Sequence, residues 1–268
     1  MSRIQTTFAT LKQHGKTALV PYITAGDPHP KHTVNLMHTL VKCGADMIEL
    51  GVPFSDPMAD GPVIQRASER ALKHKVGLTA VLQMVKDFRA VDQKTPIILM
   101  GYANPIEAIG AKAFADRAKA ADVDGVITVD YPPEECAVYV QELRSRDIDP
   151  IFLLSPTTEP SRVDLIVKQA SGFVYYVSLK GVTGAANLDI NEVSGRVAEI
   201  RQKTNLPVGV GFGIRDAATA KATAAIADAV VVGSRIVTTI ESSTDENLLH
   251  NVAALMTELK TAVDAAKQ

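Results

Sequence analysis

Eight short apolar runs, each followed by a longer amphipathic stretch, dominate this sequence. The runs are continuously apolar rather than alternating, which is typical of strands buried on both faces of a parallel sheet. They predict strands at residues 18–23, 47–51, 96–100, 125–129, 150–154, 173–177, 207–211 and 229–233. The stretches between and after them predict helices at 33–41, 63–72, 78–91, 111–121, 134–146, 161–169, 191–203, 217–225 and 247–266, and residues 4–13 predict one more helix before the first strand.

Eight consecutive strand–helix units in 268 residues predict an α/β fold, a (β/α)8 TIM barrel with an extra N-terminal helix. An open, doubly wound sheet is the alternative. It opens with a glycine-rich fingerprint after the first strand, whereas this strand runs into residues 24–28, TAGDP. Because no linker or shift in composition divides the chain, we expect one barrel domain over residues 1–268.

Composition excludes several classes of protein. Lys and Arg total 28 against 30 Asp and Glu, a net charge of -2, which argues against the basic face that nucleic acids require. The sequence lacks an apolar run long enough for a membrane span, and its first residues lack the apolar core of a signal peptide. Two cysteines, Cys43 and Cys136, cannot form a disulfide framework. We therefore expect a cytoplasmic protein.

Two acidic residues stand where a barrel places its chemistry, at the carboxyl end of a strand and in the loop after it. Glu49 interrupts the second apolar run, and an ionised, unpaired carboxylate buried there costs several kcal/mol. It is therefore either a salt-bridged residue or a general acid/base with a raised pKa. Asp60 follows in a proline-rich loop long enough to fold over the barrel mouth; alternatively, it caps the helix beginning near Pro62.

Glycines gather in three late loops. Residues 181–184 read GVTG, residues 211–213 read GFG, and Gly233 precedes Ser234. Glycine lets backbone amides approach an anion, and barrel enzymes often bind phosphate after strands seven and eight. The pattern favours a phosphate site, although tight turns or helix caps would use the same residues.

Other catalytic chemistries find little support. The six histidines form no cluster with carboxylates at metal-ligand spacing, so we expect no catalytic metal. Lys180 is a candidate for an imine with substrate, but it follows the sixth strand rather than lying within it, and we expect it to be exposed.

Four motifs in order carry a resemblance to the tryptophan synthase alpha chain family along essentially the whole chain. They are residues 21–28 (PYITAGDP), residues 49–57 with 59–62 (ELGVPFSDP, ADGP), residues 181–184 (GVTG) and residues 211–214 (GFGI). Two positions depart from the commonest family pattern: Tyr22 stands where Phe is frequent, and residues 178–180 (SLK) replace a variable stretch that often carries Arg.

The resemblance implies cleavage of indole-3-glycerol phosphate to indole and glyceraldehyde 3-phosphate, with Glu49 and Asp60 as catalytic residues. It implies substrate contacts from Tyr22, Tyr175, Thr183 and Phe212, and phosphate contacts from Gly184, Gly213, Gly233 and Ser234. It also implies no cofactor in this chain and an α2β2 heterotetramer with a beta chain that carries pyridoxal phosphate (PLP).

The chemistry of this reaction agrees with two carboxylates. The step is a retro-aldol cleavage that begins with protonation of indole C3. Asp60 can accept the indole N–H, and Glu49 can deliver the proton and then take one from the side-chain hydroxyl if its pKa is raised. The substrate side chain has no ketone, so the reaction needs no lysine imine.

Two alternatives remain at this stage. One is another phosphate-binding barrel enzyme, although a sugar-phosphate epimerase needs metal ligands and indoleglycerol-phosphate synthase needs a lysine within a strand. The other is a non-catalytic subunit that only activates a partner, against which Glu49, Asp60 and the glycine loops argue.

Loops after the second, third and fourth strands form the expected partner interface on the same face as the site. Prolines stiffen such loops and lower the entropic cost of docking, although ordinary solvent loops are the alternative. The residues expected to contact the beta chain are Asp56, Pro57, Asn104, Pro105, Asp130 and Pro132.

Overall fold

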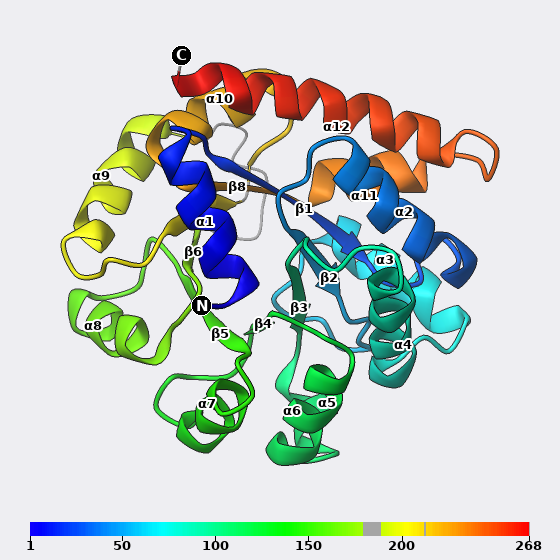
Figure 1. The fold of residues 1–268 in the computed structure, drawn as a ribbon, viewed down its shortest axis with the longest axis horizontal. Coiled ribbons are helices and arrows are strands. Elements are labelled where there is room, and N and C mark those ends of the chain that lie inside the picture. The colour runs from blue at the N-terminus through cyan, green and yellow to red at the C-terminus, as the bar shows by residue number, and fades with distance from the viewer. Residues whose placement is uncertain (179–188, 212, 268) are drawn as a thin grey trace.

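Eight parallel strands close into a barrel in sequence order, with β8 pairing back to β1 (Figure 1). The computed structural model describes residues 1–178, 189–211 and 213–267. The predicted TIM barrel is confirmed. Its strands are β1 (Ala18–Thr24), β2 (Ile48–Gly51), β3 (Ile97–Gly101), β4 (Gly125–Thr128), β5 (Asp149–Leu154), β6 (Val174–Val177), β7 (Val208–Gly211) and β8 (Ala229–Val232).

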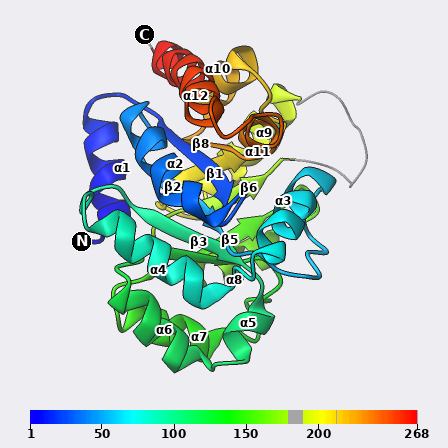
Figure 2. The same ribbon diagram turned by 90° about the vertical axis from the view of Figure 1, so that its right-hand side faces the viewer.

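Helices surround the barrel and bury one face of each against the strands (Figure 2). They are α1 (Arg3–Gln13), α2 (Pro30–Lys42), α3 (Pro62–Lys73), α4 (Leu78–Arg89), α5 (Ala103–Glu107), α6 (Ala111–Ala120), α7 (Ala137–Arg144), α8 (Pro160–Gln169), α9 (Ile190–Arg201), α10 (Ala217–Ile226), α11 (Ser234–Glu241) and α12 (Leu248–Asp264), followed by a short 3-10 turn. Among the residues that the structure describes, no helix is long and apolar enough to cross a membrane.

Two of these helices, α5 and α11, were not expected from the sequence. The central residues of α11 are mostly β-branched, which lowers intrinsic helix propensity. The helix forms because Ile236, Val237 and Ile240 bury one face against the barrel, and burial outweighs propensity. Helix α7 also begins later than predicted, at Ala137 rather than residue 134.

Helix α1 closes the amino end of the barrel. Its Ile4 and Phe8 belong to the apolar cluster that fills the barrel interior, and the Phe8 ring lies 5.7 Å from that of Phe173. A side-chain carbon at Gly125 would stand 2.9 Å from Ile4 Cδ1, so glycine there makes room for the plug. Because α1 fills this end, the chemistry of the barrel is expected at the carboxyl end of the strands.

Candidate active site

Glu49 lies inside the mouth of the barrel, on β2 and in register with Tyr22 of β1. Its side chain is only 1% exposed, and Oε2 has no hydrogen-bond partner among the described residues. Nor does the described part of the chain offer Glu49 an ion pair, which removes the support for a salt-bridged residue. Burial, and then the charge of Asp60, raise the pKa of Glu49 to about 8, so this carboxyl holds a proton at neutral pH.

Asp60 lies in the loop between β2 and α3, where its carboxylate contacts a phenol. Tyr102 Oη donates to Asp60 Oδ2 at 3.1 Å, and the backbone oxygen of Asp60 accepts from Gln65 Nε2 at 2.9 Å. The N-cap of α3 is Gly61, so Asp60 does not cap the helix. Burial raises the pKa of Asp60 to about 6, against the opposing effect of the Tyr102 hydrogen bond. The two carboxyls therefore have different pKa values.

Two buried tyrosines, Tyr22 and Tyr175, line the mouth beside Glu49. Each phenol rests on a glycine of the neighbouring strand: a side-chain carbon at Gly51 would lie 2.2 Å from Tyr22 Oη, and one at Gly211 would lie 2.2 Å from Tyr175 Oη. Burial, and then the Glu49 charge, raise the pKa of Tyr175, so its phenol stays neutral. The glycines thus make the space in which these rings lie.

Tyr102 is a site residue that the sequence motifs do not mark as catalytic or substrate-binding. Its ring stacks on Phe54 with centroids 5.0 Å apart, and its oxygen also accepts a hydrogen bond from the Ala59 amide at 3.1 Å. These contacts tie the loop that carries Asp60 to the end of β3. The signal that could have revealed Tyr102 was its place directly after a barrel strand next to that of Glu49.

The predicted phosphate residues that the structure describes follow the adjacent strands β7 and β8. Gly213 has a φ of +78°, which favours glycine, and Gly233 is the N-cap of α11, with Ser234 as its first residue. The amides of the first turn of α11 therefore begin at this end of the barrel and suit an anion. Thr183, Gly184 and Phe212, along with Lys180, lie outside the described residues.

The predicted interface residues lie in the segments that follow β2, β3 and β4. Asp56 and Pro57 line one cavity of about 320 Å³. Asn104 and Pro105 lie in the helix α5 rather than in the expected loop, because the chain turns helical directly after Tyr102. Asp130 Oδ1 accepts from the Ala103 amide at 2.7 Å, which joins the loop after β4 to the start of α5.

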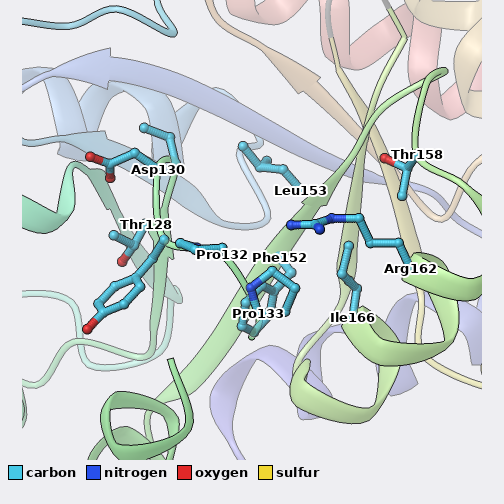
Figure 3. Close-up of a pocket in the computed structure, with 11 residues that line it drawn as sticks. Thr128, Asp130, Pro132, Pro133, Phe152, Leu153, Thr158, Arg162 and Ile166 are labelled. Carbon is cyan, nitrogen blue, oxygen red and sulfur yellow. The ribbon is translucent and has the colours of Figure 1, made fainter. Parts of the chain in front are cut away.

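A second cavity of about 320 Å³ lies between the loop after β4 and α8. Figure 3 shows Arg162 extending from α8 across this cavity, whose other side carries Asp130 and Pro132. Arg162 also pairs with Glu134 at 2.7 Å. The cavity is therefore lined by charged side chains, Arg162 and Asp130, on both of its sides. Within the described ranges, no group of three or more His, Cys, Asp or Glu side chains could hold a metal ion.

Comparison with known proteins agrees with this geometry. A family model described as "Tryptophan synthase alpha chain" matches residues 8–264. The tryptophan synthase alpha chain of Chromobacterium violaceum is 64% identical over 263 residues, covering 98% of this chain and all of the relative, and that of Ralstonia nicotianae is 59% identical over 265 residues, covering 99% and 100%. The solved tryptophan synthase subunit alpha of Legionella pneumophila superposes with a TM-score of 0.92 at 44% identity, covering 99% of both chains. A structure of tryptophan synthase from Mycobacterium tuberculosis superposes with a TM-score of 0.89 at 33% identity, covering 98% of this chain and 99% of that one.

Proposed function

The chain belongs to the tryptophan synthase alpha chain family, and we propose that Glu49 and Asp60 carry out the reaction of this indole-3-glycerol-phosphate lyase. One arrangement carries the assignment: Glu49 is buried at the barrel mouth next to Asp60, and burial raises the pKa of Glu49 to about 8 and that of Asp60 to about 6. A pair of carboxyls with separated pKa values supplies an acid and an anion in one site.

The roles follow from these protonation states. Protonated Glu49 delivers its proton to indole C3, and ionised Asp60 accepts the indole N–H and stabilises the positive charge that develops on the ring. Glu49, now ionised, takes the proton of the side-chain hydroxyl as the carbon–carbon bond breaks. The bonding electrons return to the ring, which yields indole and the aldehyde and restores protonated Glu49.

The remaining predicted contacts complete the proposal. Tyr22 and Tyr175 flank the ring, and Gly213, Gly233 and Ser234 hold the phosphate through backbone amides. Thr183, Phe212 and Gly184 keep the roles that the resemblance implies. We propose that residues 1–268 work as one barrel domain, because Glu49 comes from β2 and the phosphate residues from the loops after β7 and β8.

The beta chain is the proposed partner, in an α2β2 heterotetramer. Alpha chains of this family carry no cofactor, and PLP sits in the beta chain. We propose that this partner docks on the predicted interface residues, Asp56, Pro57, Asn104, Pro105, Asp130 and Pro132. Docking would order the segment that carries Asp60 and so shift the alpha chain toward its catalytically aligned state, which raises its activity. We also propose a cytoplasmic location, for which the free thiols of Cys43 and Cys136 are the support.

The test of the acid/base pair is indole release by Glu49→Gln and Asp60→Asn. Removing a general acid/base lowers kcat by about 10²–10⁴-fold, whereas substrate binding survives. Asp60→Asn loses less, because a neutral amide oxygen still accepts the indole N–H. Glu199→Gln, which alters an exposed ion pair on α9, is the matched control. A Glu49→Gln enzyme within about tenfold of native activity would refute the assignment.

The phosphate site has its own test. Gly213→Val and Gly233→Val displace backbone amides and raise KM. A dephosphorylated substrate that is used as efficiently as the phosphate ester would contradict the site.

The interface is tested with Asp56→Ala and Pro57→Ala, assayed with and without beta chain. We expect near-normal activity alone and lost stimulation in the complex. Val91→Ala, an exposed position in the turn after α4, is the control. Unchanged stimulation together with unchanged complex affinity would place the interface elsewhere.

A further inference from the structure

Helices α3 and α11 contact each other, and both contact β1. Each begins at one half of the proposed site: α3 starts two residues after Asp60, and α11 starts at Ser234. Ala67 of α3 and Val237 of α11 pack together against Tyr22. The relative position of these two helices therefore bears on the distance between Asp60 and the phosphate residues at the start of α11.

The fully buried side chains of α3 are small. They are Ala67, Ser68 and Ala71, with Val63 and Ile64 half-buried beside them, whereas α11 buries larger side chains, including Ile236 and Val237. Because hydrophobic stabilisation scales with the apolar area removed from water, small side chains hold α3 less firmly than α11 is held. The position of α3 depends correspondingly more on its polar contacts.

An ionic cluster joins the two helices at the C-terminal end of α11. Glu241, the last residue of α11, accepts from both arginines of α3: Arg66 Nε at 2.8 Å and Arg70 Nη1 at 2.7 Å. The two guanidiniums hold the pKa of Glu241 at about 2, so this carboxylate stays ionised.

Arg70 extends the cluster to a third element, the turn after β1. Its guanidinium binds the Asp27 carboxylate in a bidentate pair, with Nε–Oδ1 at 2.6 Å and Nη2–Oδ2 at 3.0 Å. The Asp27 side chain is fully buried. A buried carboxylate without its partner strongly destabilises the folded protein. The Arg70 guanidinium is therefore fixed in a position from which it binds both Asp27 and Glu241.

We propose that Arg70 is a positioning residue, which fixes the start of α3, and with it Asp60, relative to the phosphate-binding start of α11. This inference rests on the function proposed above. A helix is stiff, and about 12 Å of α3 separates Pro62 from Arg70. Fixing the helix at Arg70 therefore limits the tilt that would displace the loop with Asp60 from Tyr102 and the substrate.

The test uses Arg70→Met and Arg70→Lys in the isolated chain. We measure kcat for indole release and the dissociation constant of glycerol 3-phosphate, a probe that engages the phosphate half alone. We expect Arg70→Met to lower kcat by about 10- to 100-fold, because misplaced catalytic groups cost about this much, and to change the dissociation constant by less than about threefold. We expect the kcat of Arg70→Lys to lie between those of the native enzyme and Arg70→Met, because one ammonium group cannot reproduce the bidentate pair.

The matched control is Arg146→Met. Arg146 also joins two carboxylates, Asp116 and Glu142, but it lies between α7 and β5, at the closed end of the barrel. This variant loses thermal stability and keeps native kcat. Equal losses of kcat in Arg146→Met and Arg70→Met would show that general loosening is the cause and would overturn the proposal.

Two further results separate the possible failures. If Arg70→Met does not fold, Glu241→Gln provides the test, because this variant keeps the Asp27–Arg70 pair. We expect its kcat to fall by about 3- to 10-fold. Native kcat in Glu241→Gln would overturn the proposal. Native kcat in Arg70→Met, together with a lowered kcat in Asp60→Asn, refutes the positioning role alone. Native activity in Asp60→Asn refutes the proposed function itself.

Discussion

The phenol oxygen of Tyr102 lies 3.1 Å from Oδ2 of Asp60, and this contact holds the proposed catalytic carboxylate at the mouth of the barrel. The same oxygen accepts a hydrogen bond from the Ala59 amide, and the ring stacks on Phe54. Three residues of one loop thus meet a single side chain from the end of β3. The position and the ionisation of Asp60 both depend on this phenol.

Tyr102→Phe is therefore expected to move the pH dependence of the reaction. The phenol hydrogen bond lowers the pKa of Asp60, which stands at about 6, so its loss raises that pKa. Because the proposed mechanism needs ionised Asp60, the acidic limb of the kcat/KM profile should shift upward by about one pH unit.

The control for this shift is Tyr139→Phe. Tyr139 bonds Thr128 at 2.9 Å and packs on Phe114, on the outer side of the barrel wall. We expect the acidic limb of the kcat/KM profile of Tyr139→Phe to match that of the native enzyme. An unchanged limb in Tyr102→Phe would contradict the role given to the phenol.

Glu49→Gln should change how stability depends on pH. The pKa of Glu49 in the folded protein, about 8, lies above its ordinary value, so protonated Glu49 favours folding at low pH and this contribution is lost as pH rises toward 8. Glutamine does not titrate. Between pH 6 and pH 9 the native protein should lose on the order of 2–3 kcal/mol relative to Glu49→Gln, measured by urea unfolding. A constant difference between the two proteins would argue against the raised pKa.

Gly211→Ala should damage substrate binding through Tyr175. The new methyl group would stand 2.2 Å from Tyr175 Oη and 2.6 Å from its Cε2, so the ring must move out of its place in the mouth. Overpacking of this kind costs about 1–3 kcal/mol. We expect a rise in KM of about tenfold or more in steady-state assays. A native KM would show that Tyr175 does not contact the substrate.

Gly195→Ala should stabilise the protein. Gly195 lies exposed within α9, and a side-chain carbon there meets no atom within 4 Å. Alanine reduces the entropy of the unfolded chain and favours the helix by about 0.5–1 kcal/mol. Thermal unfolding measures the gain, and kcat should be unchanged. A lower melting temperature would contradict this account.

Local patterns were enough to predict the barrel and the first catalytic candidate. Strands buried on both faces leave continuous apolar runs, and eight of them separated by helices admit few architectures. Glu49 could be found because an acidic residue in such a run conflicts with burial and therefore needs a chemical reason. Glycines after β7 and β8 could be proposed for an anion because close backbone approach restricts the residue type.

The sequence by itself thus determined the eight strands and their order, and it marked Glu49 as the first catalytic candidate. Only the tertiary structure decided that α11 is a helix, that Tyr102 holds Asp60, and that Arg70 joins Asp27 to Glu241. The reason is physical: burial and backbone preference act within a few neighbouring residues and leave a periodic trace. Contacts between residues 42 to 171 positions apart depend on how whole elements pack, and no local pattern records that.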